Sequence, residues 1–196
     1  RETVENEQTG EEEEQRRVRF FPVSVFDMSQ TDLIDPEAGD PTDVARPLTG
    51  DDPAGIFDAV ADYLTGKGWT VERESIPGGA HGYTDPEGRR VVLDSDLSPA
   101  QAAKTGLHEA AHVILHAEED HAEYVEHRGT KETEAESGAY VVAGILGLDT
   151  SAYSVGYVAG WSNCDAETIK ATAANVLRAA HALADALTEQ PATVAA

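Results

Sequence analysis

The chain has 196 residues and is strongly acidic: 37 aspartates and glutamates against 14 lysines and arginines give a formal charge of −23 and a pI near 4.4. That charge argues against binding of a nucleic-acid backbone by this chain, because such binding needs clustered Lys and Arg. The hydrophobic share of 40% is enough for a folded domain, whereas no apolar run is long enough to cross a bilayer. Cys164 is the single cysteine, which excludes a disulfide framework and a cysteine-rich zinc site and favours a cytoplasmic location.

The first part of the chain is polar. Residues 1–17 include the acidic run from Glu11 to Glu14 and little that could be buried, which predicts a disordered leader or a linker. Residues 18–26 are rich in β-branched and aromatic side chains and predict a strand, followed by a loop rich in Pro and Asp. Since the chain begins with Arg1 instead of Met, we expect it to be a fragment of a longer protein.

A helix and three strands are predicted next. Asp52-Pro53 is typical of a cap and a first helical residue, and apolar positions then repeat at helical spacing up to Gly66. Alternating side chains predict a strand at residues 69–74. The segments 80–84 and 89–94 flank an Asp-Pro-Glu-Gly turn, which is typical of a β-hairpin. We therefore expect a small antiparallel sheet.

The following helix carries the motif that organises the prediction. Ser98 and Gln101 form a predicted capping box, with Pro99 as the first helical residue. The segment His108–His112 then reads HEAAH, an HExxH motif. Histidines four residues apart lie on one helical face, so both can bind one tetrahedral metal ion. Glu109 can then accept a proton from a water molecule at that metal.

The surroundings of the motif favour a metal site over an accidental match. Leu107, Ala111, Ile114 and Leu115 form an apolar stripe, which predicts that the helix is buried. Buried polar side chains without partners are costly, so the histidines and Glu109 need a partner that a metal ion supplies. The alternative is a surface helix whose histidines are solvated.

Two histidines leave a catalytic zinc site incomplete, because such a site usually has three protein ligands and a water. A helix predicted at residues 130–146 provides three candidates. Glu132 and Glu136 are four residues apart and share a face, whereas Glu134 points in nearly the opposite direction. We assign Glu132 to the metal and Glu136 to a hydrogen bond with a ligand histidine, which fixes its tautomer. Glu134 remains the alternative third ligand.

The other histidines fit the metal site less well. His116 follows on the same straight helix and cannot complete a tetrahedron, so we expect it to pack near the site. His121 and His127 fall in a polar predicted loop and are expected to be solvated. The metzincin class is excluded, because Leu115 and Glu118 occupy the positions of its glycine and its third histidine.

The remaining predictions concern the packing of the helices. Small Ala135 and Ala139 would let the glutamate-bearing helix approach its neighbour closely. A short helix with aromatic residues is predicted at 153–161, and a helix at 165–187 has an apolar stripe suited to docking on the domain. Residues 188–196 are expected to form a flexible tail.

The segment HEAAHVILH, followed further along by KETEAESGAYVV, resembles the ImmA/IrrE-type zincin metallopeptidases and, more closely, the peptidase domain of ArdC-like antirestriction proteins. Phe21–Thr31 is similar to the strand ahead of that domain, and Tyr157–Trp161 is similar to its Tyr-x-x-x-Trp segment. The resemblance covers roughly residues 18–187. It implies a gluzincin-like zinc site with His, His and Glu ligands and a glutamate general base. It also implies an N-terminal domain that binds single-stranded DNA, which we expect to be missing from this chain.

Together these observations predict an α+β, zincin-like metallopeptidase domain over residues 18–187, in which a small antiparallel sheet, a glutamate-bearing helix and a C-terminal docking helix surround the HExxH helix. One Zn²⁺ per chain is expected on His108, His112 and Glu132, with Glu109 as the general base. The predicted reaction is hydrolysis of peptide bonds in a protein or peptide substrate, a regulatory or defence-related protein, without binding of nucleic acid by this chain itself.

Two alternatives remain open. In one, the chain is a non-catalytic acidic antirestriction or binding module with structural zinc, whose surface occupies a nuclease or repressor or imitates DNA. In the other, the chain is an accessory interaction domain whose zinc is purely structural, and its acidic surface only keeps the protein in solution. Glu109 separates catalysis from both, because a structural site does not need a base beside the metal. Tyr140 and Tyr157 are candidate oxyanion donors, or else aromatics of the core or rim.

Overall fold

The computed structural model describes residues 2–5, 12–15, 45–119, 121–163 and 165–188, and the chain divides into two compact units, Arg1–Gly39 and Asp40–Ala196. In the first unit, β1 (Glu2–Glu5) pairs antiparallel with β2 (Glu12–Gln15). These strands differ from the leader without secondary structure predicted at residues 1–17, although a two-stranded ribbon alone is marginally stable. The strand predicted at 18–26 lies outside the described residues.

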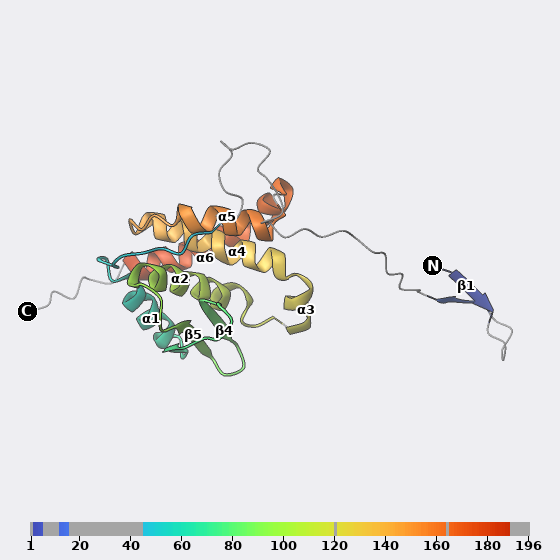
Figure 1. Cartoon of the computed structure of the whole chain (residues 1–196), viewed down its shortest axis with the longest axis horizontal. Helices are drawn as coiled ribbons and strands as arrows, with labels where there is room; N and C mark the ends of the chain where they lie inside the picture. Colours follow the sequence, from blue (N-terminus) through green and yellow to red (C-terminus); the bar gives the residue numbers. More distant parts are fainter. Residues whose placement is uncertain (1, 6–11, 16–44, 120, 164, 189–196) are drawn as a thin grey trace, which may run out of the picture. The chain divides into compact units, whose positions relative to one another are not determined.

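The second unit has an α+β fold, shown in Figure 1. Its elements, in chain order, are α1 (Ile56–Gly66), β3 (Thr70–Glu74), β4 (Gly82–Asp85), β5 (Arg90–Asp94), α2 (Pro99–His116), α3 (His121–Glu126), α4 (Arg128–Ile145), α5 (Ser151–Trp161) and α6 (Ala166–Thr188). Among the described residues, no helix combines the length and the apolar character that a bilayer crossing requires.

The sheet has the order β3-β5-β4, with β3 parallel to β5 and β4 antiparallel to β5. The hairpin prediction is confirmed, but the prediction of a wholly antiparallel sheet is wrong. Alternation and turn residues indicate where strands lie, yet they do not reveal that the chain crosses over after β3. The central strand carries the fully buried residues Val91, Val92 and Leu93. This burial on both sides explains its unbroken apolar run.

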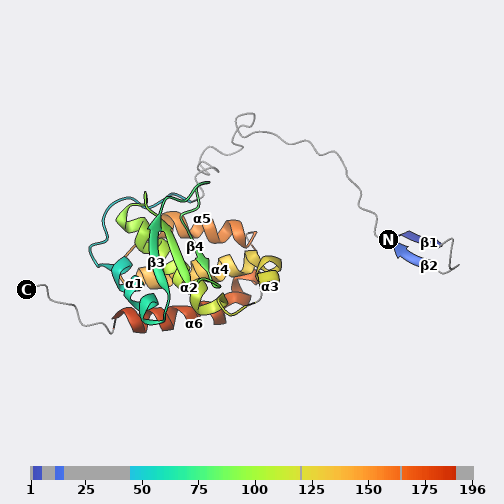
Figure 2. The ribbon, with the colours of Figure 1, turned by 90° about the horizontal axis from the view of Figure 1, so that it is seen from below.

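The helix α2 occupies the middle of the fold. In Figure 1, α5, α4 and α2 follow one another from top to bottom, and Figure 2 shows the strands lying across α2. The helices α1 and α4 pack on α2, and α6 packs on α4. The position of α2 between the sheet and the other helices explains why nearly all of its side chains are buried, including the polar ones.

Small residues bring the central helices close together. A Cβ atom on Gly138 of α4 would lie 3.4 Å from Cβ of Ala179 and 3.9 Å from Cβ of Ala111. Ala135 and Ala139 are buried, as predicted from their place beside the glutamate face. The close approach directs that face of α4 toward α2.

Two helix predictions needed correction. The helix α1 begins at Ile56 instead of Pro53, although Asp52 still accepts a hydrogen bond at its start, from the backbone N–H of Phe57 at 2.8 Å. The apolar stripe predicted for α6 is buried only in its second half, because Ile169 and Leu177 are 39% and 54% exposed. The helix meets α4 through small side chains such as Ala179, a contact that hydrophobicity alone does not reveal.

Candidate metal centre

The start of α2 is fixed as predicted. The Ser98 hydroxyl accepts a hydrogen bond from the backbone N–H of Gln101 at 3.2 Å, and Pro99 is the first helical residue. The Gln101 side chain does not reach back to the cap; its carbonyl oxygen accepts a hydrogen bond from the backbone of Leu48 at 2.7 Å. These contacts fix the register of the HExxH helix in the core.

His108 and His112 on α2 and Glu132 on α4 form a buried cluster whose ligand atoms lie within 4.8 Å of one another. The two histidine Nε2 atoms are 3.1 Å apart, and Glu132 Oε2 lies 3.4 Å from Nε2 of His108 and 3.8 Å from that of His112. Ligands of a tetrahedral zinc with bonds of about 2.0–2.1 Å lie about 3.3 Å from each other. The three observed separations surround this value, so the cluster can hold a metal ion.

Glu134 points elsewhere. Its Oε1 accepts a hydrogen bond from Asn175 of α6 at 2.7 Å, and its Oε2 lies 3.4 Å from Nε2 of His116. Glu134 is two positions from Glu132, so the two carboxylates leave α4 on different sides. The geometry therefore places Glu132, and not Glu134, beside the two histidines of the motif.

Glu136 lies against the ring of His108. Its Oε2 is 2.7 Å from Nδ1 of His108, and the same oxygen accepts a hydrogen bond from the ammonium of Lys104 at 2.6 Å. The other oxygen accepts from the Ser154 hydroxyl at 2.6 Å. Burial raises the pKa of Glu136, but the contacts with His108 and Lys104 outweigh it and bring the pKa to about 2. The carboxylate is thus ionised and held on both sides.

His108 and His116, both on α2, have opposite electrostatic environments. Burial lowers the pKa of His108, yet hydrogen bonds with Glu132 and Glu136 outweigh it and raise that pKa to about 9. Burial and the neighbouring His112 lower the pKa of His116 to about 4. The His116 ring centroid lies 5.5 Å from that of His112, which agrees with its predicted place near the site.

Glu109, the predicted base, lies on α2 and contacts the strand β4. It is 5% exposed, and its Oε2 accepts a hydrogen bond from the Thr84 hydroxyl at 2.8 Å. A Cβ atom on Gly82 would lie 3.1 Å from Glu109 Oε1 and 2.9 Å from Cγ2 of Thr105. The absence of a side chain on Gly82 therefore allows β4 to pass close to this carboxylate.

Two tyrosines contact the carboxylate of Glu132. Tyr157 on α5 donates to Oε2 at 2.8 Å, and Tyr124 on α3 donates to Oε1 at 3.2 Å. Burial and the charge of Glu132 raise the pKa of Tyr157. Tyr157 is one of the oxyanion-donor candidates named from the sequence, whereas the other, Tyr140, is exposed on α4.

Several residues at the site were not predicted from the sequence. Tyr124 was missed because α3 lies in a segment predicted to be a loop, whereas His127 in the same segment is exposed as expected. Lys104 lies one helical turn before His108, so its spacing could have indicated that it shares the face of the motif. Ser154 left no comparable pattern in the sequence.

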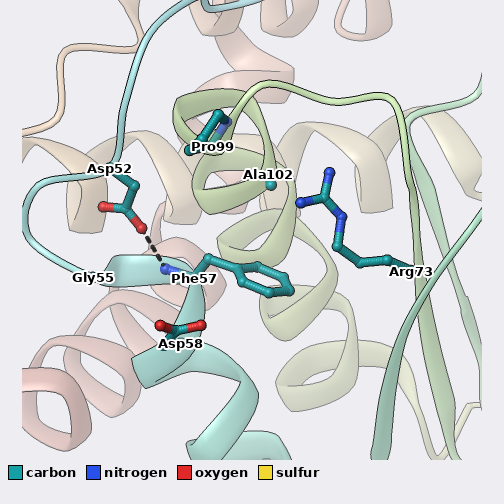
Figure 3. A pocket seen from close by; sticks show the side chains of 7 residues that line it. All are labelled: Asp52, Gly55, Phe57, Asp58, Arg73, Pro99 and Ala102. Carbon is teal, nitrogen blue, oxygen red and sulfur yellow. Dashed lines mark hydrogen bonds between the residues drawn. The ribbon is translucent and has the colours of Figure 1, made fainter.

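A separate cavity of about 180 Å³ lies where α1 and α2 begin, and it contains none of the cluster residues. Figure 3 shows its lining residues Asp52, Gly55, Phe57, Asp58, Arg73, Pro99 and Ala102. The Arg73 guanidinium donates hydrogen bonds to three backbone carbonyls, those of Asp94, Ser95 and Leu97. Arg73 is therefore engaged in holding the loop after β5.

Comparisons with known proteins give matches of different extent. Residues 68–154 match the model of the IrrE N-terminal-like domain, Peptidase_M78. The chain is 34% identical over 73 residues to the uncharacterised protein pXO2-81 of Bacillus anthracis, a match that covers 37% of this chain and 12% of that protein.

Two crystal structures of the antirestriction protein ArdC from plasmid R388 are similar in structure. The metal-free form has 25% sequence identity and a TM-score of 0.46, with 95% of this chain and 67% of that chain covered. The Mn(II)-bound form has 24% identity and a TM-score of 0.49, with 74% and 57% covered.

The family match includes β3, β4, β5, the HExxH helix and the glutamate-bearing helix α4. The two helices α2 and α4 carry His108, Glu109, His112 and Glu132. Residues 68–154, within a unit of α+β fold, are therefore similar to the IrrE N-terminal-like domain, in agreement with the ImmA/IrrE resemblance that the two motifs predicted.

Proposed function

We propose that this domain is a zinc-dependent peptidase, with His108, His112 and Glu132 as the metal ligands and Glu109 as the general base. The observation that carries the proposal is the buried cluster of these three ligands on α2 and α4, with the Glu109 carboxylate next to a ligand in the chain. A domain stabilised by metal alone would not need a second carboxylate buried at that position.

His108, His112 and Glu132 would hold the zinc ion, which would supply a Lewis acid for the peptide carbonyl and would lower the pKa of a water molecule. Glu109 accepts the proton and can deliver it to the leaving amine. The hydrogen bond from Thr84 orients its carboxylate. Glu136 holds the ring of His108 through Nδ1, which leaves Nε2 free to face the metal.

The peptide substrate has a suitable place along β4. This strand lies at the edge of the three-stranded sheet and also carries Thr84, which contacts the base. An extended peptide that adds to such an edge gains backbone hydrogen bonds and lies next to Glu109. Tyr157 and Tyr124 donate their hydroxyl hydrogens to Glu132 and thereby orient this proposed ligand. We place the substrate among regulatory or defence-related proteins, following the family resemblance.

The test is cleavage mapping of cellular proteins by N-terminal labelling, comparing the wild type with Glu109→Gln. We expect new N-termini that appear with the wild type and are absent with the variant. Glu118→Gln is the matched control, because Glu118 is an exposed glutamate just beyond α2 and should leave the cleavage pattern unchanged. An identical pattern for wild type and Glu109→Gln contradicts the proposal.

The charge of −23 favours a second candidate, an acidic binding module with a structural metal. Such a module would act by occupying a basic surface on a partner protein, and its effect would not need Glu109. A biological effect that persists in Glu109→Gln and weakens with rising salt supports this candidate over the peptidase.

A further inference from the structure

Lys104 is a buried lysine beside the candidate metal centre. It lies one turn before His108 on α2, and its side chain is 4% exposed. Burial lowers its pKa, an effect that the carboxylate of Glu136 opposes. A buried ammonium is strongly unfavourable unless its partners compensate for the lost water, so its contacts indicate what it does.

The first contact is with Glu136. A single oxygen, Glu136 Oε2, accepts hydrogen bonds from Lys104 at 2.6 Å and lies 2.7 Å from Nδ1 of His108. The other oxygen is occupied by Ser154 at 2.6 Å. Lys104 and Ser154 therefore prevent the carboxylate from turning away from His108. A carboxylate in this place selects the tautomer with hydrogen on Nδ1 and leaves the Nε2 lone pair for a metal.

The second contact is with the aromatic residues of α5. The ammonium of Lys104 lies 3.8 Å from the ring centroid of Tyr153 and 5.3 Å from that of Tyr157, within the range of cation–π attraction. The two rings are stacked with centroids 5.5 Å apart. Tyr157 in turn donates its hydroxyl to Glu132 at 2.8 Å. Lys104 therefore contacts both Glu136, which lies against His108, and Tyr157, which donates to Glu132.

We propose that Lys104 is a positioning residue of the metal centre, which holds Glu136 against His108 and Tyr157 against Glu132 so that the two ligands converge before the metal binds. The inference rests on the proposed metal site. Lys104 itself contributes no ligand atom, because its ammonium is already engaged with Glu136 and Tyr153. Its contribution to metal binding is therefore indirect.

The test is a double-mutant cycle on the purified chain, with Lys104→Met, Glu136→Gln and the variant carrying both. Zinc affinity is measured by competition with a chelator, and the visible spectrum of bound Co²⁺ reports the ligand geometry. Each single change should lower the zinc affinity by about 10–100-fold, the usual effect of replacing a residue that hydrogen-bonds to a metal ligand. The double variant should bind nearly as well as the weaker single variant, because both changes remove the same contact.

Lys131→Met is the matched control. Lys131 donates to Glu119 at 2.7 Å in a partly buried pair, and its ammonium is engaged with Glu119 instead of Glu136. Its replacement should leave the zinc affinity and the Co²⁺ spectrum unchanged. Thermal unfolding monitored by circular dichroism establishes that each variant is folded. If Lys104→Met does not fold, Lys104→Gln replaces it in the cycle and the same non-additive loss is expected, since its amide keeps a donor without the charge.

The outcomes separate the two proposals. If the wild type binds zinc and the folded Lys104→Met variant binds it equally well, the proposed role of Lys104 is overturned. The proposed metal centre is not affected by that result. Fully additive losses in the cycle also overturn it, because Lys104 would then act independently of Glu136. A wild type that binds neither zinc nor Co²⁺ overturns the proposed metal centre and this inference with it.

Discussion

The hydroxyl of Thr84 on β4 donates a 2.8 Å hydrogen bond to Oε2 of Glu109 on α2. The carboxylate is therefore held against the edge strand of the sheet, in a place where it is 5% exposed. Because an extended peptide would pair with the same strand, β4 would position both Glu109 and the substrate. In the proposed mechanism, the position of β4 would then control both substrate binding and proton transfer.

Gly82→Ala tests this arrangement. The added Cβ would lie 2.9 Å from Thr105 Cγ2 and 3.1 Å from Glu109 Oε1, and 3.0 Å from a backbone oxygen of β5, so the strand or the carboxylate must move. A displacement of this kind can reduce cleavage by about 10²-fold. Zinc content should not change, because no proposed ligand lies on β4.

Gly144→Ala is the control for the glycine substitution. A Cβ on Gly144 of α4 meets no atom within 4 Å apart from its chain neighbours and the backbone of its own helix, so cleavage by this variant should equal that of the wild type. Both variants are compared by initial rates at equal zinc content. Unchanged cleavage by Gly82→Ala would show that the contact of β4 with Glu109 is not needed for activity.

The assignment of the third ligand gives a second prediction. Glu132→Ala should lose most of the bound metal, because it removes the carboxylate that lies 3.4 Å from Nε2 of His108. Glu134→Ala should keep the metal, since Glu134 bonds to Asn175 of α6. Elemental analysis of the two purified variants distinguishes them. The reverse result would place Glu134 at the metal.

The raised pKa of His108 gives a prediction for the dependence on pH. In the metal-free protein this pKa is about 9, so at pH 7 the ring carries a proton that a metal must displace. His116 is already neutral at pH 7, because its pKa is about 4. Titration calorimetry in buffers of different ionisation enthalpy should therefore detect release of about one proton from His108 per zinc. No proton release would contradict the proposed protonation of His108.

The same shift affects stability without metal. A pKa raised from 6.5 in the unfolded chain to about 9 in the fold stabilises the metal-free protein below pH 6.5. This contribution is lost as the pH rises through 9. Denaturant unfolding of the metal-free protein across this range measures the loss, and Glu136→Gln should reduce it because one acceptor for His108 becomes neutral.

Much of the site could be predicted from short-range sequence patterns. The spacing of His108 and His112, and of Glu132 and Glu136, follows from helical geometry, since four residues return a side chain to the same face. The Ser98 cap was predicted for the same reason, because it depends on residues close in the chain. Such patterns state which side chains share a face, although they do not state which helix that face meets.

The features that depend on distant contacts were not predictable. The parallel pairing of β3 with β5 depends on the path of the chain between them, which no local pattern records. Lys104 could be placed on the face of His108, but its pairing with Glu136 depends on how α2 and α4 pack. The exposure of Ile169 and Leu177 on α6 likewise reflects contact through small residues.

The charge of the chain gives a prediction about nucleic acid. With 37 acidic against 14 basic residues, this polypeptide should not bind single-stranded DNA at physiological salt, because phosphate binding needs clustered cations. Fluorescence anisotropy with a labelled oligonucleotide measures this directly. Binding at micromolar concentration or below would show that the chain has a cationic surface despite its net charge.

Cleavage by Glu109→Gln tests the central claim most directly. The variant keeps the size of the side chain and can still bond to Thr84, so its zinc content and melting temperature should match those of the wild type. Removing the basicity of Glu109 should reduce the rate on a mapped substrate by at least about 10²-fold, the low end of what a positioned acid or base contributes. A variant with full zinc that cleaves at the wild-type rate would contradict the assignment of Glu109 and the peptidase mechanism built on it.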